Sequence, residues 1–296
     1  MNEENVRQNS FKAWILAARP KTLTAALIPV VTACALAWKD SAFNLYAATV
    51  CMTFASLMQI ASNLINDLYD FKKGTDGDDR LGPKRATAQG WITPKAMQAG
   101  IMITLITACA FGCLLISQSG LWLVALGAAC VVFAFLYTTF LSYYGFGDIL
   151  VIIFFGIVPV TATYYIQAEK ITPELLICAF SCGIVSDTLL VLNNFRDRDT
   201  DRRTGKRTLI VMLGERFGKN LYLWLGIAAC ALTLSLACRG MWPAALLPLP
   251  YIIIHVKTWR TMIRINRGRE LNAVLGMTSR NMSVFAMLLS AGILLS

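Results

Sequence analysis

The sequence predicts an all-α protein that crosses a membrane several times. Of its 296 residues, 56% are hydrophobic and only 15% are charged, and the mean hydropathy is +0.58. Soluble domains carry about 25% charged residues, so this chain has too many apolar side chains for a water-soluble protein of its size. The apolar residues gather in runs of about 20, the length of helix that crosses a bilayer core of about 30 Å. Composition therefore excludes a soluble enzyme, a disordered chain and a disulfide scaffold.

Apolar runs and the residues that interrupt them predict nine transmembrane helices in a single integral-membrane domain, 1–296. Some of these helices should continue past the membrane, so that polar motifs at their ends are also helical. Residues 1–21 form an N-terminal arm. The spans are expected near residues 22–38, 43–65, 96–117, 121–141, 148–167, 173–194, 219–238, 241–256 and 278–295.

The distribution of basic residues predicts the orientation. The net charge is +10, and all but three of the 27 Lys and Arg residues fall in the N-terminal arm or in loops on one side of the nine-span arrangement. The exceptions are Lys39, Lys170 and Arg239. Because cytoplasmic loops collect positive charge, this side and the N-terminus are expected to be cytoplasmic. Membrane topology explains the basic charge better than nucleic-acid binding does, since the charges lie in short loops between apolar spans.

Cysteine and histidine do not predict a metal site. All nine Cys residues lie inside apolar stretches, where a thiol usually acts as a small hydrophobic side chain. There is no Cys-x-x-Cys pair, and His255 is the only histidine, so an ordinary zinc site is not expected.

Two stripes of acidic and amide side chains lie where the second and sixth predicted spans reach the cytoplasm. In the first, Asn63, Asp67 and Asp70 are spaced i, i+4 and i+7, which places them on one face of a helix. In the second, Asp197 and Asp201 are spaced i, i+4. One such pair alone is usually a solvated helix end, but two stripes at the same membrane face favour a shared binding site. Amides extend the stripes: Asn66, Asn193 and Asn194.

The stripes predict a Mg²⁺ site for a diphosphate. Carboxylates gathered at a membrane boundary repel one another unless cations lie between them. Mg²⁺ takes about six oxygen ligands, commonly one or two carboxylates together with phosphate oxygens and water. The expected metal ligands, which are also the expected catalytic carboxylates, are Asp67, Asp70, Asp197 and Asp201. Nearby basic residues are expected to take the outer phosphate oxygens: Lys84, Arg85, Lys206 and Arg207.

The segment 137–148, between the fourth and fifth spans, is rich in aromatic residues on the same membrane face. The π faces of Tyr137, Tyr143 and Tyr144 can stabilise a cation. Tyrosine is also common at membrane interfaces for reasons unrelated to catalysis, and the pattern alone does not separate the two interpretations.

Three acidic residues have no assigned role. Asp187 lies within the sixth span, where a charge is costly, and either faces a cavity or is a packed, protonated side chain. Asp76 and Asp78 follow the first stripe and either help to hold the metal or are solvated.

Several strings resemble the UbiA-type intramembrane aromatic prenyltransferases, and among these the branch that acts on 1,4-dihydroxy-2-naphthoate. The resemblance covers nearly the whole chain. The strings are RPKTL at 19–23, NDLYDFKKGTD at 66–76, DRLGPKR at 79–85, GFGD at 145–148 and NNFRD at 193–197. Two departures stand out: Gly74 replaces a third aspartate found widely in the family, and Phe140, Leu141 and Ser142 replace a Gly-Pro pattern of the naphthoate branch.

The resemblance implies a bundle of nine helices around a central cavity that opens to membrane lipid. Mg²⁺ and the aspartates would hold a polyprenyl diphosphate, whose C–O bond ionises so that the naphthoate ring attacks the allylic cation. The implied product is demethylmenaquinone, with loss of CO₂ and diphosphate, made in the bacterial cytoplasmic (inner) membrane. The resemblance adds Tyr137 to the catalytic residues. It also adds to the substrate-binding residues Lys21, Asn63, Asn66, Arg80, Tyr144, Asp148, Asn193 and Asn194.

Other functions remain open from the sequence. A 4-hydroxybenzoate or haem prenyltransferase would be the same class of enzyme with another acceptor. A transporter would favour interrupted helices and charges near the membrane midplane, whereas the acids here gather at one face. A lipid-binding scaffold protein would show no turnover.

Overall fold

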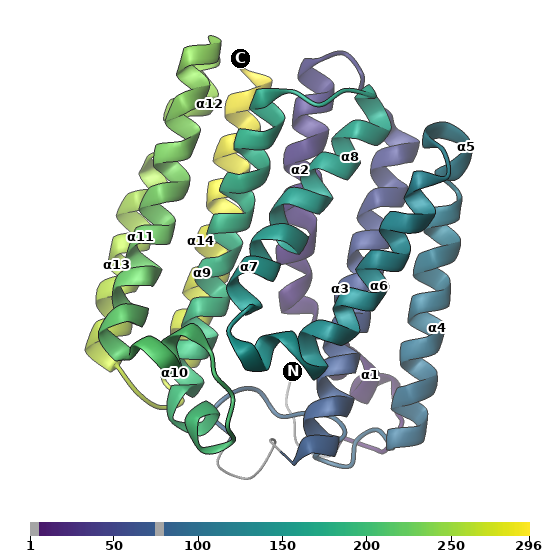
Figure 1. The fold of residues 1–296 in the computed structure, drawn as a ribbon, viewed down its shortest axis with the longest axis vertical. Coiled ribbons are helices and arrows are strands. Elements are labelled where there is room, and N and C mark those ends of the chain that lie inside the picture. The colour runs from purple at the N-terminus through teal and green to yellow at the C-terminus, as the bar shows by residue number, and fades with distance from the viewer. Residues whose placement is uncertain (1–5, 75–79) are drawn as a thin grey trace.

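The computed structural model describes residues 6–74 and 80–296, and every regular element in these ranges is a helix (Figure 1). The predicted all-α membrane fold is thereby confirmed. The α-helices are α1 (Phe11–Ala18), α2 (Leu23–Lys39), α3 (Leu45–Lys73), α4 (Pro94–Cys113), α5 (Ile116–Ser119), α6 (Trp122–Thr139), α7 (Gly147–Ile152), α8 (Val158–Ala168), α9 (Pro173–Arg203), α10 (Leu209–Leu213), α11 (Glu215–Leu234), α12 (Trp242–Leu246), α13 (Pro250–Ile265) and α14 (Leu271–Leu294). Shorter 3₁₀ or π turns are η1 (Pro20–Thr22), η2 (Leu141–Tyr144), η3 (Ile153–Ile157) and η4 (Ser235–Arg239).

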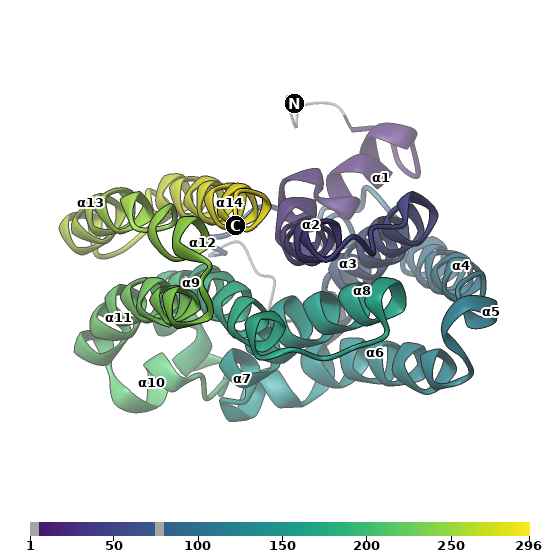
Figure 2. The ribbon, with the colours of Figure 1, turned by 90° about the horizontal axis from the view of Figure 1, so that it is seen from above.

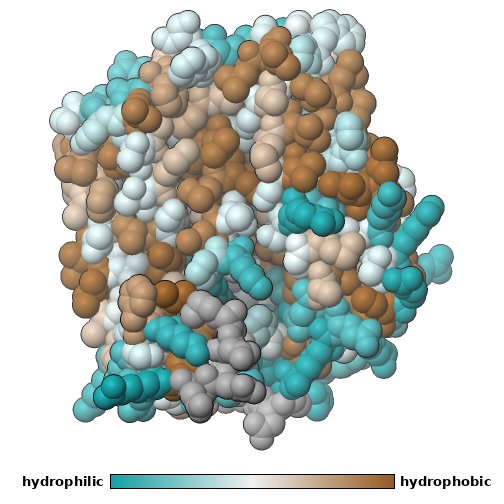
Figure 3. Space-filling view, turned by 180° about the vertical axis from the view of Figure 1, so that it is seen from behind, coloured by the Kyte–Doolittle hydropathy of each residue, from teal (hydrophilic) through white to brown (hydrophobic). Residues whose placement is uncertain are grey.

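The long helices run side by side in two rows. Seen from above, α13, α14, α2, α3 and α4 form one row, and α11, α9, α8 and α6 form the other (Figure 2). The largest apolar cluster joins α2, α8, α9 and the helices from α11 to α14. A second cluster joins α1, α3 and α4 with Ala86 and Ile92 from the loop between α3 and α4. Polar side chains gather at the lower end of the bundle, and apolar ones cover most of the rest of the face in view (Figure 3).

Seven helical segments in the described ranges are long and apolar enough to cross a membrane, the last being Glu215–Arg239. The two remaining predicted spans correspond to α12 with α13 and to α14, which carries Arg280 and so is less apolar. Both pack along the bundle, since α14 lies against α2 and α13. The chain is therefore a multi-pass membrane protein, and the count of nine crossings stays a prediction.

Two helices extend well beyond the predicted membrane spans and carry the polar stripes. The helix α3 starts at the N-cap Asn44, whose side chain accepts from the backbone of Ala47, and ends at Gly74 in the left-handed conformation that glycine tolerates best. The helix α9 starts at the N-cap Thr172, followed by Pro173. Each ends about two turns past its predicted span, so the acidic motifs are helical as expected.

Close packing of α9 against the turn η3 depends on two glycines. A Cβ on Gly156 would lie 2.4 Å from the Cα of Gly183, and a Cβ on Gly183 would lie 2.6 Å from the carbonyl oxygen of Ile152. Both clashes are with backbone atoms, which cannot rotate away. The absence of these two side chains is what lets the α7–η3–α8 segment lie directly on α9.

The helix α6 is the most exposed of the long helices and meets η3 and α8 through aromatic side chains. Its Phe133 packs on Phe154 with ring centroids 5.1 Å apart, and its Trp122 packs edge-on against Tyr165 at 5.4 Å. Exposed apolar side chains such as Val132 and Leu136 lie on the surface of the bundle that meets lipid. The wall made by α6 is thus held by ring contacts at two levels, to η3 and to α8.

The nine-span arrangement predicts a pattern of accessibility for single cysteines in a Cys-free background. Cysteines placed at Arg203 and Arg267 should react from one side of the membrane, and those at Gln118 and Leu295 from the other, when an impermeant maleimide is added to intact and to opened vesicles. All four positions are exposed. Reaction of Leu295→Cys from the same side as Arg267→Cys would show that α14 does not cross.

The glycine contact predicts a loss of stability. Gly183→Ala should lower the free energy of unfolding by about 1–3 kcal/mol, because the new methyl group meets rigid backbone. The measurement is the thermal unfolding midpoint in detergent. Gly276→Ala is the control, since a Cβ there meets nothing within 4 Å, and it should leave the midpoint unchanged or raise it slightly. Equal midpoints for both variants would contradict the packing argument.

Candidate active site

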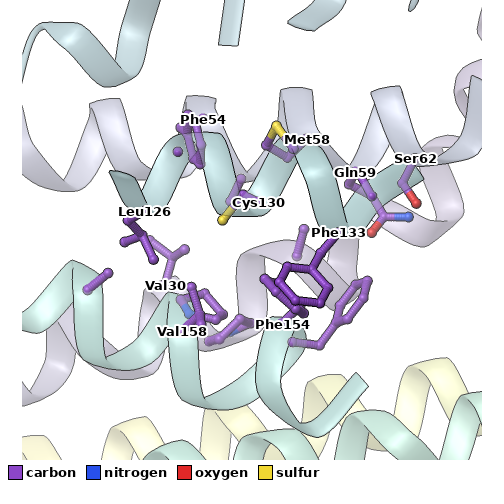
Figure 4. Close-up of a pocket in the computed structure, with 18 of the residues that line it drawn as sticks. Val30, Phe54, Met58, Gln59, Ser62, Leu126, Cys130, Phe133, Phe154 and Val158 are labelled. Carbon is purple, nitrogen blue, oxygen red and sulfur yellow. The ribbon is translucent and has the colours of Figure 1, made fainter. Parts of the chain in front are cut away.

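A cavity of about 560 Å³ lies between α2, α3, α6 and the α7–η3–α8 segment. Most of its wall is apolar: Phe54 and Met58 of α3 face Leu126, Cys130 and Phe133 of α6 across it (Figure 4). Most of the polar side chains in the lining lie at the end nearest the two acidic stripes, while Ser186 and Thr163 line the cavity further along. The polar side chains at the stripe end are Arg19, Thr22, Gln59, Ser62, Asn63, Asn66, Tyr137 and Asn193.

The amides of the first stripe hold two neighbouring segments in place. The Nδ2 of Asn63 donates to the carbonyl of Ala18 at 2.9 Å and to the hydroxyl of Thr22 at 2.8 Å, which fixes the turn between α1 and α2. The Oδ1 of Asn66 accepts from the hydroxyl of Thr138 on α6. Both amides also line the cavity, so their positions set the shape of its polar end.

The two carboxylates of the first stripe have different environments. Asp67 is buried, and its oxygens accept from the backbone N–H groups of Ala86 and Thr87, both at 2.8 Å. Asp70, one turn further, receives the guanidinium of Arg85 at 2.6 Å and is partly exposed. Asp70 is therefore paired with a cation, whereas Asp67 is held by a loop.

The second stripe begins with an adjacent Arg–Asp pair. Arg196 donates through Nε and NH2 to both oxygens of Asp197, at 2.7 and 2.6 Å. Its NH1 donates to Oδ1 of Asn272 on α14, and the Nδ2 of Asn272 donates to the carbonyl of Leu81. A Cβ on Gly82 would lie 3.0 Å from NH2 of Arg196. The loop after α3 thus rests against the second stripe as well as the first.

The second carboxylate of this stripe, Asp201, has one oxygen available. Its Oδ1 lies 3.7 Å from the ammonium of Lys206, and its Oδ2 is buried with no hydrogen-bond partner among the described residues. Lys206, Asn194 and Asp148 line a small pocket next to it. Tyr137 lines both this pocket and the large cavity, so its side chain lies between the two.

Several predicted binding residues lie on the surface rather than in the cavity wall. The side chains of Lys21, Lys84, Arg207 and Tyr144 are exposed. Tyr144 packs on Phe140. Arg80 is half-buried and donates to the carbonyl of Pro83. Asp76 and Asp78 lie outside the described residues, and Asp187 is buried next to η3 without lining the cavity.

The sequence did not single out five residues that the structure places at the polar end. Arg19 lines the cavity where Lys21 was expected. Lys73 donates to the carbonyl of Thr139 at 2.9 Å and lies 3.7 Å from the ring centroid of Tyr143. The others are Thr138, Arg196 and Asn272. Arg19, Lys73 and Arg196 stand inside the quoted strings, and Thr138 lies inside the aromatic segment 137–148, which were the available signals, whereas nothing marks Asn272 in the sequence.

The donor chemistry of the two stripes fits Mg²⁺. In the part of the chain that the structure describes, no three Asp, Glu, His or Cys side chains are close enough to hold a metal without other ligands. Mg²⁺ commonly uses only one or two carboxylates, and phosphate oxygens and water complete its shell. Asp70, Asp197 and the free oxygen of Asp201 offer such ligands on two facing helices. The metal role of all four predicted aspartates stays a prediction.

Fold and site together define a class of protein. An apolar cavity inside a membrane bundle accepts a long hydrocarbon chain, and the polar end with its paired carboxylates and cations accepts an anionic head group. The protein is thus built to hold an amphiphile with an apolar tail and a charged head at the membrane surface.

The chain belongs to the UbiA prenyltransferase family, whose model matches residues 26–287. This confirms the resemblance seen in its motifs. It is 35% identical over 250 residues to a 1,4-dihydroxy-2-naphthoate octaprenyltransferase of Escherichia coli K12, covering 81% of this chain and 79% of that protein. It is 36% identical to the protein of that name from Mycobacterium tuberculosis, covering 94% and 95%. A UbiA homologue from Archaeoglobus fulgidus, solved bound to GPP and Mg²⁺, superposes with a TM-score of 0.67 at 12% identity, covering 96% of this chain and 100% of that one.

The contact between Asn272 and the loop after α3 predicts a change in protease sensitivity. Asn272→Ala removes the hydrogen bond to Leu81 and should raise the rate of tryptic cleavage after Lys84 and Arg85 about fivefold, since one hydrogen bond contributes about 1 kcal/mol to local stability. Asn281→Ala on the same helix is the control, because its partners Ile254 and Thr258 lie on α13. Equal cleavage rates in the two variants would show that Asn272 does not restrain the loop.

Proposed function

We propose that this protein transfers a polyprenyl group from a polyprenyl diphosphate to 1,4-dihydroxy-2-naphthoate, with loss of CO₂ and diphosphate. The observation that carries the proposal is the pair of acidic stripes at the polar end of an apolar, membrane-embedded cavity. The names of the relatives from Escherichia coli and Mycobacterium tuberculosis support the choice of acceptor. We further propose that residues 1–296 act as one domain.

The diphosphate would lie between α3 and α9, with the tail along the apolar wall. Asp70, Asp197 and Asp201 are the proposed ligands for Mg²⁺, which when bound neutralises the charge that develops on the leaving diphosphate. UbiA homologues solved in complex with GPP or DMAPP and Mg²⁺ support this choice of cofactor.

The basic residues at the polar end are already paired with carboxylates. Arg85 pairs with Asp70, and Lys206 faces Asp201. A bound diphosphate offers both cations new oxygen partners without large movements of the backbone. Such preorganised charges stabilise the leaving group more effectively than water does, because little reorganisation is needed when the C–O bond breaks.

The allylic carbon would lie beside the aromatic residues at the boundary between the polar end and the apolar wall. Tyr137, Phe133 and Phe154 stand there, and their π faces can stabilise the cation that forms as the C–O bond electrons leave with the diphosphate. The apolar wall keeps water away from this cation. The naphthoate ring then supplies the electron pair for the new C–C bond.

We also propose that the protein lies in the bacterial cytoplasmic membrane with its N-terminus and the acidic stripes on the cytoplasmic side. The placement of basic residues near the site supports this orientation. Soluble dihydroxynaphthoate would then reach the site from the cytoplasm, and the polyprenyl chain from the bilayer.

The test is an assay of purified protein with one polyprenyl diphosphate and Mg²⁺, offering dihydroxynaphthoate and 4-hydroxybenzoate in parallel. Turnover is expected with the naphthoate, and EDTA should abolish it until Mg²⁺ is restored. Asp70→Asn and Asp201→Asn should each lower kcat about a hundredfold or more, because a misplaced diphosphate loses both position and charge stabilisation.

Asp199→Asn is the matched control for these variants. Asp199 lies on α9 between the two stripe carboxylates, is about half exposed, and lies 3.8 Å from Arg267, its one ion-pair partner among the described residues. Its turnover should stay close to that of the parent protein. Preference for 4-hydroxybenzoate would replace the proposed acceptor, and release of no diphosphate with either acceptor would exclude a prenyltransferase.

A further inference from the structure

We infer that Asp67 is a positioning residue that holds the basic loop (residues 80–93) over the site, and that it is not one of the metal ligands. The inference concerns the same site as the proposed function and rests on that function for its kinetic part. It replaces the simplest interpretation of the first acidic stripe, in which all of its carboxylates bind the metal.

The first argument is access. Asp67 is only 1% exposed, whereas the side chain of Asp70 is 20% exposed and that of Asp197 is 29% exposed. The side chain of Asp201 is 11% exposed, and none of the four aspartates lines the large cavity, so exposure is what separates them. A metal ion that bridges protein and diphosphate has to lie where the diphosphate can reach, and Asp67 is the least exposed of the four.

The second argument is that both oxygens of Asp67 have committed partners. Oδ2 accepts from the N–H of Ala86 and Oδ1 from the N–H of Thr87, each at 2.8 Å. Ala86 and Thr87 are themselves buried. If Asp67 turned towards a metal ion, two buried backbone donors would lose their acceptors, and such donors are costly to leave unpaired.

The third argument is what this pair of hydrogen bonds positions. The two N–H groups belong to the residues directly after Arg85, whose guanidinium reaches Asp70 at 2.6 Å. Asp67 and Asp70 lie one turn apart on α3. The carboxylate of Asp67 therefore fixes the backbone from which Arg85 extends, and so fixes the distance between Arg85 and the carboxylate proposed to bind the metal.

The rest of the loop depends on the same anchor. The carbonyl of Ala86 accepts from the N–H groups of Trp91 and Ile92, which closes the turn that leads into α4. The side chains of Ala86 and Ile92 pack into the cluster between α3 and α4. Asp67 therefore holds the loop by accepting hydrogen bonds from its backbone, while Ala86 and Ile92 hold it by apolar packing.

The experiment compares Asp67→Asn with Asp70→Asn in full-length protein, by three measurements. The first is the rate of tryptic cleavage after Lys84 and Arg85 without substrate. The second is the KM for the polyprenyl diphosphate at saturating Mg²⁺. The third is the Mg²⁺ concentration that gives half-maximal rate at saturating polyprenyl diphosphate.

For Asp67→Asn we expect cleavage about tenfold faster and a KM about tenfold higher, with the half-maximal Mg²⁺ concentration and the KM for the naphthoate within twofold of the parent. The new amide presents a donor to one of the two N–H groups, so the loop is released while the proposed metal ligands are untouched. For Asp70→Asn we expect a raised Mg²⁺ requirement with a smaller rise in cleavage than for Asp67→Asn, because the amide oxygen still accepts from Arg85 and the loop backbone stays held by Asp67.

The inference is overturned if Asp67→Asn raises the Mg²⁺ requirement as much as Asp70→Asn does, or if it leaves tryptic cleavage unchanged. Should Asp67→Asn fail to fold, Thr87→Pro removes one of the two N–H donors and keeps Asp67 itself. A positioning role predicts faster cleavage and a higher KM for that variant, whereas a metal-binding role predicts parent values. If the parent protein shows no turnover, the proposed function fails but the cleavage measurement still tests the loop contact.

Discussion

The structure depends on how the cytoplasmic end of α3 satisfies the polar groups around it. At the edge of a membrane, a polar backbone or side-chain group without a protein partner finds little water with which to form a hydrogen bond. Four polar residues at this end of α3 each bind a different neighbour: Asn63 the α1–α2 turn, Asn66 the helix α6, Asp67 the backbone of residues 86–87, and Asp70 the guanidinium of Arg85. One helix thereby fixes the relative positions of three other segments, and the polar end of the cavity is the space they enclose.

Charge at this end is balanced before any ligand binds. Asp70, Asp197 and Asp201 each lie beside a cation, respectively Arg85, Arg196 and Lys206. Breaking a partly buried ion pair by removing one partner leaves an uncompensated charge, so these pairs hold the site in one arrangement more than they add to stability. The electrostatic repulsion among the three carboxylates is offset by these neighbouring cations, and the same cations can bind an anionic head group.

The sequence predicted the membrane class, most helix positions and the two acidic stripes, because these are local patterns of hydropathy and helical spacing. It could not predict which stripe residue faces the cavity, since Asn66 and Asp67 are adjacent and their side chains leave the helix in directions only about 100° apart. Nor could it show which of the many cations line the cavity: the side chains of Lys21, Lys84 and Arg207 are exposed and do not line it, and their binding role stays a prediction. Asn272 reaches the loop from the far end of the chain, a contact that no short-range pattern encodes.

The apolar wall of the cavity has a thermodynamic consequence for how a membrane-borne ligand is chosen. A hydrocarbon tail that enters from the bilayer leaves one apolar medium for another, so the roughly 0.8 kcal/mol per buried CH₂ that water would contribute is absent. The acyl chains of lipids are equivalent fillers for the space between Phe54, Cys130 and Phe133. Occupancy is therefore an exchange between tails of nearly equal free energy, and selection rests on the head group at the polar end.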